Sequence, residues 1–378
     1  MEGSPSLSPL SSPSEMTQTW LEQVLEKKLG SSVKIKTWSM KKPETKSGYL
    51  SEICFIKISF FVCGEGNEKK EEERSLVAKF FPESDQIMKT MEKNCLGERE
   101  VEFYKHTLTE EFRLFCKNSG LCHPAPDVYL AELRDRKLSL VLHDLNSEGF
   151  KLSVPIEGNS LQQIKSTLAS VAVIHASGIA TIRNHGKHPV DISFSSSNLG
   201  SFLVDGINIQ MKILEGTHIK DNVKSLLPLS QEFLTVEEKH PFVDTLIHGD
   251  LWTANVMFSE GDQEACIFDW QFARIGNLVC DIVSLLLMSG APHTYTEHLA
   301  EVLECYWESL EQSLKKNGIP VDITFPDLVR NVESMWIYGY MFFTLSLSAM
   351  IGNQIDEDRV KAVVHFMEKK EVFKKFLS

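Results

Sequence analysis

The fold of this chain is indicated most clearly by Leu246-Ile-His-Gly-Asp-Leu-Trp-Thr-Ala-Asn-Val-Met-Phe258, which is followed by Ile267-Phe-Asp-Trp-Gln271. Asp250, Asn255 and Asp269 each lie beside a short apolar run. Transfer of a γ-phosphoryl group needs a carboxylate that positions and deprotonates the attacking hydroxyl, and oxygen ligands that hold magnesium against the nucleotide phosphates. Asp250 suits the first role. Asn255 and Asp269 suit the second, because magnesium prefers hard oxygen ligands.

The pattern His-Gly-Asp-x-Trp-x-x-Asn-x-Met resembles the catalytic loop of the choline-kinase and aminoglycoside-phosphotransferase superfamily. Trp252 and the downstream Asp-Trp-Gln make it similar to the ecdysteroid-kinase-like (CHK kinase-like) branch. The resemblance runs from about Val33 to the C-terminus and is densest over 246–281. The alternative is an ordinary strand–turn–strand with an incidental Asp and Asn.

This resemblance implies a bilobal protein-kinase-like fold of the α+β class. Residues 15–145 would form a small antiparallel-sheet N-lobe that binds nucleotide, and residues 146–378 a mainly helical C-lobe that carries the chemistry and the substrate site. Residues 1–14 are rich in Ser and Pro and lack an apolar run, which indicates a disordered tail without a signal peptide. The implied activity is ATP-dependent and Mg²⁺-dependent phosphorylation of a hydroxyl on a small-molecule acceptor.

Other residues of the motif region receive supporting roles from the resemblance. His248 belongs to the catalytic loop, and we expect it to hold that loop through a backbone hydrogen bond. Asp281 matches an Asp-Leu pair of the family, so we expect it to brace the loop through hydrogen bonds. Gln271 stands where choline and aminoglycoside kinases usually carry a second acidic residue, so a metal or substrate contact there is expected to differ.

A lysine in the third expected strand is the first candidate for nucleotide binding. Lys79 lies within 75–81, on the face opposite Leu76, Ala78 and Phe80, and a charge in an apolar strand needs a partner. Glu100, in a helical stretch expected over 85–108, matches a Glu-x-x-Phe-Tyr pattern of the family. The pair would hold the α- and β-phosphates, as kinases do. The alternative for Lys79 is a surface lysine with an extended aliphatic stem.

Two further segments are placed against the nucleotide by position in the fold. The turn 46–51, with Gly48 and Ser51, would cover the phosphates with backbone N–H groups. His143 to Leu145 would form the linker where adenine docks on the main chain of Asp144 and Leu145. Family members usually have Glu at the position of His143, which leaves a side-chain role at the linker in question.

Hydrophobic periodicity gives the remaining elements of interest. We expect a helix over 16–29, strands over 33–38 and 49–63, and a flexible hairpin loop for the charged run 64–74. A second hairpin is expected from 127–133 and 137–142. A strong helix is expected over 160–177, capped by Ser160 and stopped by Gly178, with His175 in the core and hydrogen-bonded to the backbone.

Composition limits the possible partners. The formal net charge of −13 argues against nucleic acid and against an anionic membrane surface. The uncharged stretch 334–355 is long enough to span a bilayer, but its polar residues and acidic flanks favour a buried core helix. Eight cysteines without a Cys-x-x-Cys pair indicate reduced thiols and a cytoplasmic location.

The same motif region bears on two other classes of protein. A protein kinase is disfavoured because Gly249 replaces the usual Arg and no Ala-Pro-Glu follows the Asp-Trp-Gln. A catalytically inactive nucleotide-binding scaffold remains the alternative. The joint presence of Lys79, Glu100, Asp250, Asn255 and Asp269 speaks against it, because a scaffold has no chemical need for the base.

Overall fold

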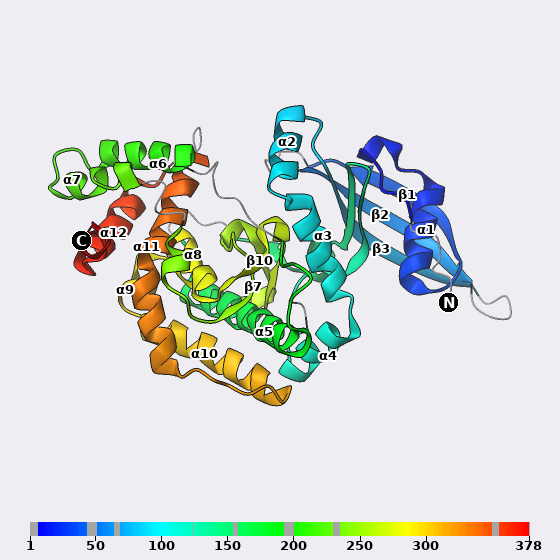
Figure 1. The fold of residues 1–378 in the computed structure, drawn as a ribbon. Coiled ribbons are helices and arrows are strands. Elements are labelled where there is room, and N and C mark those ends of the chain that lie inside the picture. The colour runs from blue at the N-terminus through cyan, green and yellow to red at the C-terminus, as the bar shows by residue number, and fades with distance from the viewer. Residues whose placement is uncertain are drawn as a thin grey trace. The chain divides into compact units, whose positions relative to one another are not determined.

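The chain divides into two compact units in a computed structural model. The described residues are 7–43, 51–63, 69–122, 124–153, 158–192, 200–229, 235–349 and 355–377. Unit 1 comprises residues 1–113 and 125–150, and unit 2 comprises residues 114–124 and 151–378. The antiparallel sheet lies in unit 1 and most helices lie in unit 2, as the α+β class predicts (Figure 1).

Unit 1 is built on a five-stranded antiparallel sheet of strand order β1-β2-β3-β5-β4. Its strands are β1 (Val33–Lys41), β2 (Glu52–Cys63), β3 (Lys69–Phe80), β4 (Val128–Arg134) and β5 (Lys137–His143). Its helices are α1 (Gln18–Leu29), α2 (Asp85–Lys93) and α3 (Leu96–Thr107). The expected hairpin of β4 and β5 is therefore present.

The two faces of this sheet carry different helices. Helix α1, capped by the Thr17 side chain and ended by a left-handed Gly30, contributes Trp20 and other apolar side chains to one core. The β3 side chains that point into this core are Leu76, Ala78 and Phe80. Because side chains alternate along a strand, Lys79 points to the other face, where α3 lies.

Two predictions for this unit are wrong. Strand β3 begins at Lys69, so the charged run is strand from there on; ladder pairing with β2 and the Lys36–Glu71 ion pair outweigh its polar composition. The expected single helix over 85–108 is two helices, because Cys95 adopts a left-handed conformation with φ 52° and breaks the backbone ladder.

The N-terminal segment is also partly mispredicted. Residues 1–6 lie outside the described part of the chain, but residues 7–14 pack on unit 1. The Leu10 amide donates to Ser139 Oγ at 2.8 Å, and Trp20 Nε1 donates to the Ser8 carbonyl at 3.2 Å. Pro13 is buried. The prediction of a disordered tail is therefore wrong for residues 7–14. Their apolar side chains pack on unit 1, and composition alone does not reveal such packing.

Unit 2 is mainly helical. Helix α4 (Glu110–Ser119) begins in unit 1 and ends in unit 2. The others are α5 (Leu161–His185), α6 (Gly200–Ile213), α7 (Ile219–Lys224), α8 (Val279–Ser289), α9 (Pro292–Thr296), α10 (Leu299–Lys316), α11 (Phe325–Ala349), α12 (Glu357–Lys369) and α13 (Val372–Leu377). Helix α5 packs on α10, and α8 packs on α11 (Figure 1).

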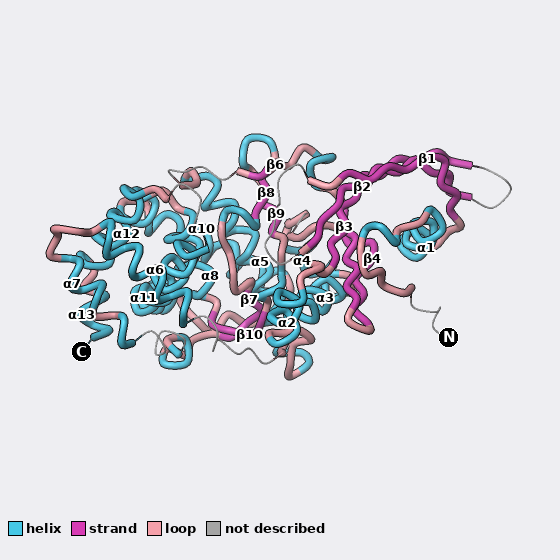
Figure 2. The backbone as a smooth tube through the Cα atoms, turned by 90° about the horizontal axis from the view of Figure 1, so that it is seen from above, coloured by secondary structure: helices cyan, strands magenta, loops and turns pink. Residues whose placement is uncertain are grey.

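Two small antiparallel sheets in unit 2 carry the motif region. One pairs β7 (Asp244–Ile247) with β10 (Arg274–Asn277), and the other has the order β6-β8-β9. The members of the second are β6 (Lys151–Leu152), β8 (Val256–Phe258) and β9 (Ala265–Ile267). Figure 2 shows the two sheets as separate groups of short strands. The motif loop therefore connects one sheet to the other.

Helix α5 is longer than predicted. Ser160 caps the helix as predicted, and the structure adds a capping box with Gln163. The helix continues past Gly178 to His185, where Gly186 ends it. A Cβ on Gly178 would lie 2.4 Å from Thr245 Oγ1 and 2.6 Å from the Leu246 amide nitrogen. Gly178 therefore permits close contact with β7 instead of stopping the helix.

The apolar helices of unit 2 form its core. The expected core helix over 334–355 corresponds to α11, whose described part ends at Ala349 and whose Trp336 and Tyr340 are fully buried. Within the described residues, α5 alone is long and apolar enough to cross a membrane, and it is largely buried among other helices.

Candidate active site

The motif loop leaves strand β7 and is shaped by the burial of that strand. Thr245, Leu246 and Ile247 are fully buried, and the chain then turns through His248 and Gly249 before a short 3₁₀ turn at 253–255. Gly249 has φ 77°, and a Cβ there would lie 2.5 Å from the Phe272 carbonyl oxygen. Both the conformation and the close approach require glycine at this position.

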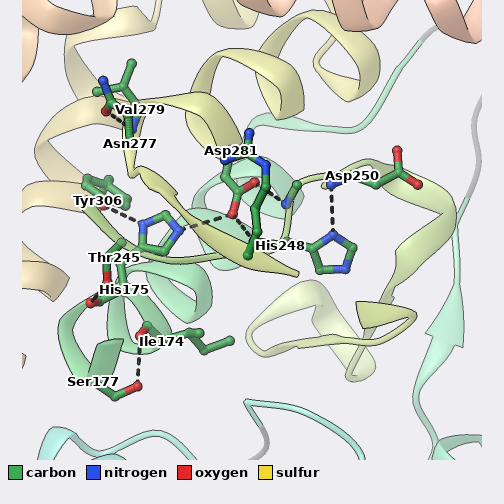
Figure 3. Close-up of polar contacts among 12 residues, drawn as sticks. Ile174, His175, Ser177, Thr245, His248, Asp250, Asn277, Val279, Asp281 and Tyr306 are labelled. Carbon is green, nitrogen blue, oxygen red and sulfur yellow. Dashed lines mark hydrogen bonds and ion pairs between the residues drawn. The ribbon is translucent and has the colours of Figure 1, made fainter. Parts of the chain in front are cut away.

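Asp281, at the start of α8, braces the loop as predicted. Its carboxylate accepts hydrogen bonds from the backbone amides of His248 at 2.7 Å and Gly249 at 3.0 Å (Figure 3). Burial alone would raise the pKa of Asp281, but the hydrogen bond and charge of His175, together with the contacts of His248, lower it. The carboxylate is therefore held ionised beneath the loop.

A second layer lies behind Asp281. His175 of α5 is fully buried, with Nε2 at 3.2 Å from Asp281 and Nδ1 at 2.8 Å from the Tyr306 hydroxyl of α10 (Figure 3). His175 is thus a core residue, as predicted, but its ring binds side chains and not the backbone. Tyr306 was missed, because nothing in the local sequence of α10 marks it.

The His248 ring holds the loop through backbone hydrogen bonds, as predicted. Its Nε2 lies 3.0 Å from the Phe268 carbonyl, and the Asp250 amide donates to its Nδ1 at 3.2 Å. These two contacts fit a neutral ring protonated on Nε2. The buried ring also packs against Trp270, with ring centroids 4.5 Å apart.

The three predicted phosphotransfer residues gather at one end of the antiparallel β8–β9 pair, because Asp250 and Asn255 precede β8 and Asp269 follows β9. Asn255 Nδ2 donates to the Asp250 backbone oxygen at 3.0 Å and lies 3.4 Å from Asp250 Oδ2. The Phe268 amide donates to the Asn255 carbonyl, which fixes the next residue, Asp269, beside the loop. Asp269 has φ 64°, a conformation that is uncommon outside glycine and is often found at functional sites.

Electrostatics distinguish Asp250 from Asp281. Burial, followed by the negative charge of Asp269, raises the pKa of Asp250 to about 8, and the hydrogen bond from Asn255 offsets only part of this. The side chain remains partly exposed, so water also offsets some of the cost. Figure 3 shows the Asp250 carboxylate pointing away from the His248–Asp281 contacts.

Thr253 fixes the far end of the loop, a role that no local sequence pattern indicates. Its amide donates to Ser289 Oγ at 2.8 Å, and its hydroxyl lies 2.5 Å from the Ser153 carbonyl and 2.7 Å from the Asn159 side chain. Asn159 in turn donates its amide to the Ser289 carbonyl. Ser289 at the end of α8, together with Ser153 and Asn159, therefore positions this end of the loop.

A partly buried ion pair anchors the segment before β7 and was also missed. Arg274 Nη1 lies 2.9 Å from Glu237, and Arg274 Nη2 lies 2.5 Å from the same carboxylate and 2.9 Å from the Tyr338 hydroxyl. Glu237 also accepts from the Asn277 amide. This bidentate contact ties residues 237–240 to β10, in a region where the sequence pattern was uninformative.

In unit 1, the predicted ion pair is present. Lys79 Nζ lies 2.8 Å from both oxygens of Glu100, and both side chains are buried. The neighbour Glu102 is exposed and pairs with Lys105 at 3.0 Å. The predicted helix register at Glu100 is therefore correct, and the role of the pair in nucleotide binding remains a prediction.

The other predicted nucleotide contacts are less informative. Gly48 lies outside the described residues, and Ser51 precedes β2 with a partly buried side chain. The Asp144 side chain caps a 3₁₀ turn through the Asn146 amide, and its own amide donates to Ser75. Leu145 is buried, and His143 Nε2 lies 3.0 Å from Glu148.

The chain belongs to the ecdysteroid kinase-like family, whose sequence profile matches residues 45–319. The family belongs to the kinase-like phosphotransferases that act on small molecules. The matched residues include Lys79, Glu100 and the whole motif loop. No curated protein matches the chain.

Several solved structures are similar to the chain at low sequence identity. Macrolide 2′-phosphotransferase type I is 16% identical, with 93% of this chain and 97% of that chain covered and a TM-score of 0.41. A choline kinase from Streptococcus pneumoniae is 11% identical, with 93% and 98% covered and a TM-score of 0.38. A Plasmodium vivax ethanolamine kinase is 10% identical, with 89% and 84% covered and a TM-score of 0.38.

Proposed function

We propose that this protein is an ATP-dependent phosphotransferase that moves the γ-phosphate to a hydroxyl of a small-molecule acceptor. The observation that carries the proposal is that Asp250 and Asn255 lie on one loop whose backbone is held by buried hydrogen bonds. Asp281 and Thr253 hold the two ends of that loop through buried hydrogen bonds, while the Asp250 carboxylate stays partly exposed. A fixed loop with an accessible carboxylate is the requirement for positioning an attacking hydroxyl.

The residues fit a nucleotide with magnesium. Asn255 Nδ2 is used by Asp250, which leaves Oδ1 as the amide atom suited to a metal, and Asp269 supplies a carboxylate. The charge of Asp269 opposes ionisation of Asp250, so a cation between them would relieve the repulsion. Magnesium, when bound, would neutralise charge on the phosphates. Lys79, oriented by Glu100, would hold the α- and β-phosphates.

In this proposal each residue has a separate task. Asp250 accepts a hydrogen bond from the acceptor hydroxyl and takes its proton as the phosphoryl group transfers. His248 keeps the Asp250 backbone in place, and Asp281 keeps the His248 backbone in place. Location in the cytoplasm and absence of nucleic-acid or membrane partners are parts of the same proposal. These parts of the proposal rest on the formal net charge of −13 and on the eight free cysteines.

The test is a phosphotransfer screen with two readouts. Purified protein with Mg-ATP is incubated with a metabolite extract and with ecdysone, choline and kanamycin, while ADP release and products heavier by one phosphate are measured. We expect a phosphorylated product that vanishes with EDTA and returns with Mg²⁺ or Mn²⁺. Full turnover without metal would contradict the metal assignment. Nucleotide binding without a product from any acceptor would favour the inactive scaffold.

A further inference from the structure

The N-terminal strap, which we define as residues 7–16, lies along the β4–β5 hairpin of unit 1. The Leu10 amide donates to Ser139 Oγ of β5 at 2.8 Å. Two residues earlier in the strap, Ser8 Oγ accepts from Arg134 Nη2 of β4 at 2.9 Å. The strap therefore follows the hairpin in a fixed register, with Ser8 at the end of β4 where the hairpin turns.

Two positively charged side chains meet where Ser8 lies. Arg134 and Lys137 are direct cross-strand partners in the hairpin, and such partners project from the same face of an antiparallel pair. Glu132, two residues before Arg134 on that face, already pairs with Lys27 at 2.8 Å. The Ser8 side chain is exposed. Its hydroxyl therefore lies at the surface beside two positive charges.

A second serine of the strap has the same local sequence but different surroundings. Within the described residues, Ser8 and Ser12 each precede a proline. The Ser12 hydroxyl contacts Ser14 Oγ at 2.7 Å, and the acidic Glu15 belongs to the same 3₁₀ turn. A negative group added to Ser12 would meet a like charge, whereas one added to Ser8 would meet a guanidinium.

We propose that Ser8 is a phosphorylation site for a proline-directed protein kinase, and that Arg134 and Lys137 receive the phosphate. The kinase transfers the γ-phosphoryl group of ATP to Ser8 Oγ. The bond between the γ-phosphorus and the oxygen that bridges it to the β-phosphorus breaks, the Oγ–P bond forms, ADP leaves and the hydroxyl proton passes to the kinase. This site is independent of the proposed function, because the chain is here the substrate.

The strap can open for a kinase and is held more firmly afterwards. Residues 7–12 form no helix or strand, and hydrogen bonds from Trp20 Nε1 to the Ser8 carbonyl and from the Leu10 amide attach them to unit 1. Release of such a segment breaks few contacts. A phosphate carries a charge of about −1.5 to −2 at pH 7, so the Arg134 hydrogen bond to a neutral hydroxyl becomes charge-assisted. Phosphorylation therefore fastens the strap to the hairpin.

The test has two readouts on the full chain. A purified proline-directed protein kinase and Mg-ATP are added, and the phosphate is located by mass spectrometry of peptides. Ser12→Ala is the matched control for Ser8→Ala, because each removes a serine that precedes a proline. Opening of the strap is then measured as the rate of chymotrypsin cleavage after Leu10. Arg134→Gln removes the guanidinium and keeps Ser8, so it also reveals any direct effect of the phosphate on the protease.

We expect wild type and Ser12→Ala to gain a phosphate on Ser8, and Ser8→Ala to lack it. Phosphorylation should slow cleavage after Leu10 about fivefold in wild type and in Ser12→Ala, and clearly less in Arg134→Gln. Absence of phosphate from Ser8 in wild type would overturn the site. Cleavage that is not slowed in wild type, or is slowed equally in Arg134→Gln, would overturn the assignment of the hairpin as the receiver of the phosphate.

Discussion

Two charged sites, one in each unit, differ in how their buried charges are compensated. In unit 1, Lys79 and Glu100 are buried together at 2.8 Å, so each charge compensates the other. In unit 2, burial and then the negative charge of Asp269 raise the pKa of Asp250 to about 8. The first site is electrostatically complete within the chain. The second is incomplete, and in the proposed function a cation would complete it.

The third carboxylate of the motif region shows that burial by itself does not cause this difference. Asp281 is more deeply buried than Asp250, yet the hydrogen bond and charge of His175, followed by the contacts of His248, lower its pKa. What separates the two is the supply of donors. A carboxylate that braces a loop is surrounded by hydrogen-bond donors, whereas one that is to accept a proton must be left with few of them.

The largest expected effect is on turnover at the incomplete site. Asp250→Asn removes the proposed base but keeps the size of the side chain. We expect kcat to fall by about 10²–10⁴ while Mg-ATP still binds. Asp358→Asn, an aspartate with 96% side-chain exposure, is the control and should leave kcat unchanged. A folded Asp250→Asn enzyme that binds Mg-ATP and keeps most of its activity would place the base elsewhere.

The next effect is on stability at the complete site. Glu100→Ala leaves Lys79 buried without its partner and should lower the free energy of unfolding by about 3–5 kcal/mol and weaken nucleotide binding. Glu102→Ala breaks the exposed pair on the same helix and should cost less than about 1 kcal/mol in chemical denaturation.

A double replacement sharpens the distinction between stability and nucleotide binding. Lys79→Met with Glu100→Leu should recover most of the lost stability, because no unpaired charge remains, and should still bind nucleotide poorly. Recovery of both properties would show that the pair is structural only.

The bracing layer should give a smaller, graded effect. Asp281→Asn weakens two charge-assisted hydrogen bonds to the loop and should cost about 2–3 kcal/mol of stability and lower kcat. Tyr306→Phe removes only the hydroxyl that faces His175 and should cost about 1 kcal/mol. Both losses of stability are measured by urea denaturation. Equal losses would contradict the expectation that Asp281 contributes more than Tyr306 to holding the loop.

The smallest effect concerns pH and stability without metal. A carboxyl whose pKa is raised on folding, here from 3.8 to about 8, is destabilising above its unfolded value, and the penalty grows until the folded value is passed. The partly exposed side chain is screened by solvent, which reduces this penalty. The melting temperature of Asp250→Asn minus that of wild type should therefore rise by only a few degrees between pH 5 and pH 8 and level off above. Mg-ATP should reduce this difference, and Asp358→Asn should show none.

Local patterns in the sequence were sufficient for much of the architecture. The alternation in β1 and β2, the N-cap at Ser160 and the spacing of Lys79 and Glu100 each depend on residues close together in the chain. The motif itself predicted that Asp281 braces the loop and that His248 binds backbone. Where local signals conflicted with long-range contacts, the prediction was wrong, as at Gly178 and in the charged start of β3.

The sequence by itself therefore determined the family, the α+β class and the identity of the residues proposed for chemistry, because a short loop carries them at fixed spacing. Only the tertiary structure decided which partners surround them. The His175–Tyr306 contact joins residues 131 positions apart on two helices, and the Thr253–Ser289 contact joins residues 36 positions apart. Such contacts arise when buried polar groups in packed elements must satisfy one another, and no periodicity along the chain records that requirement.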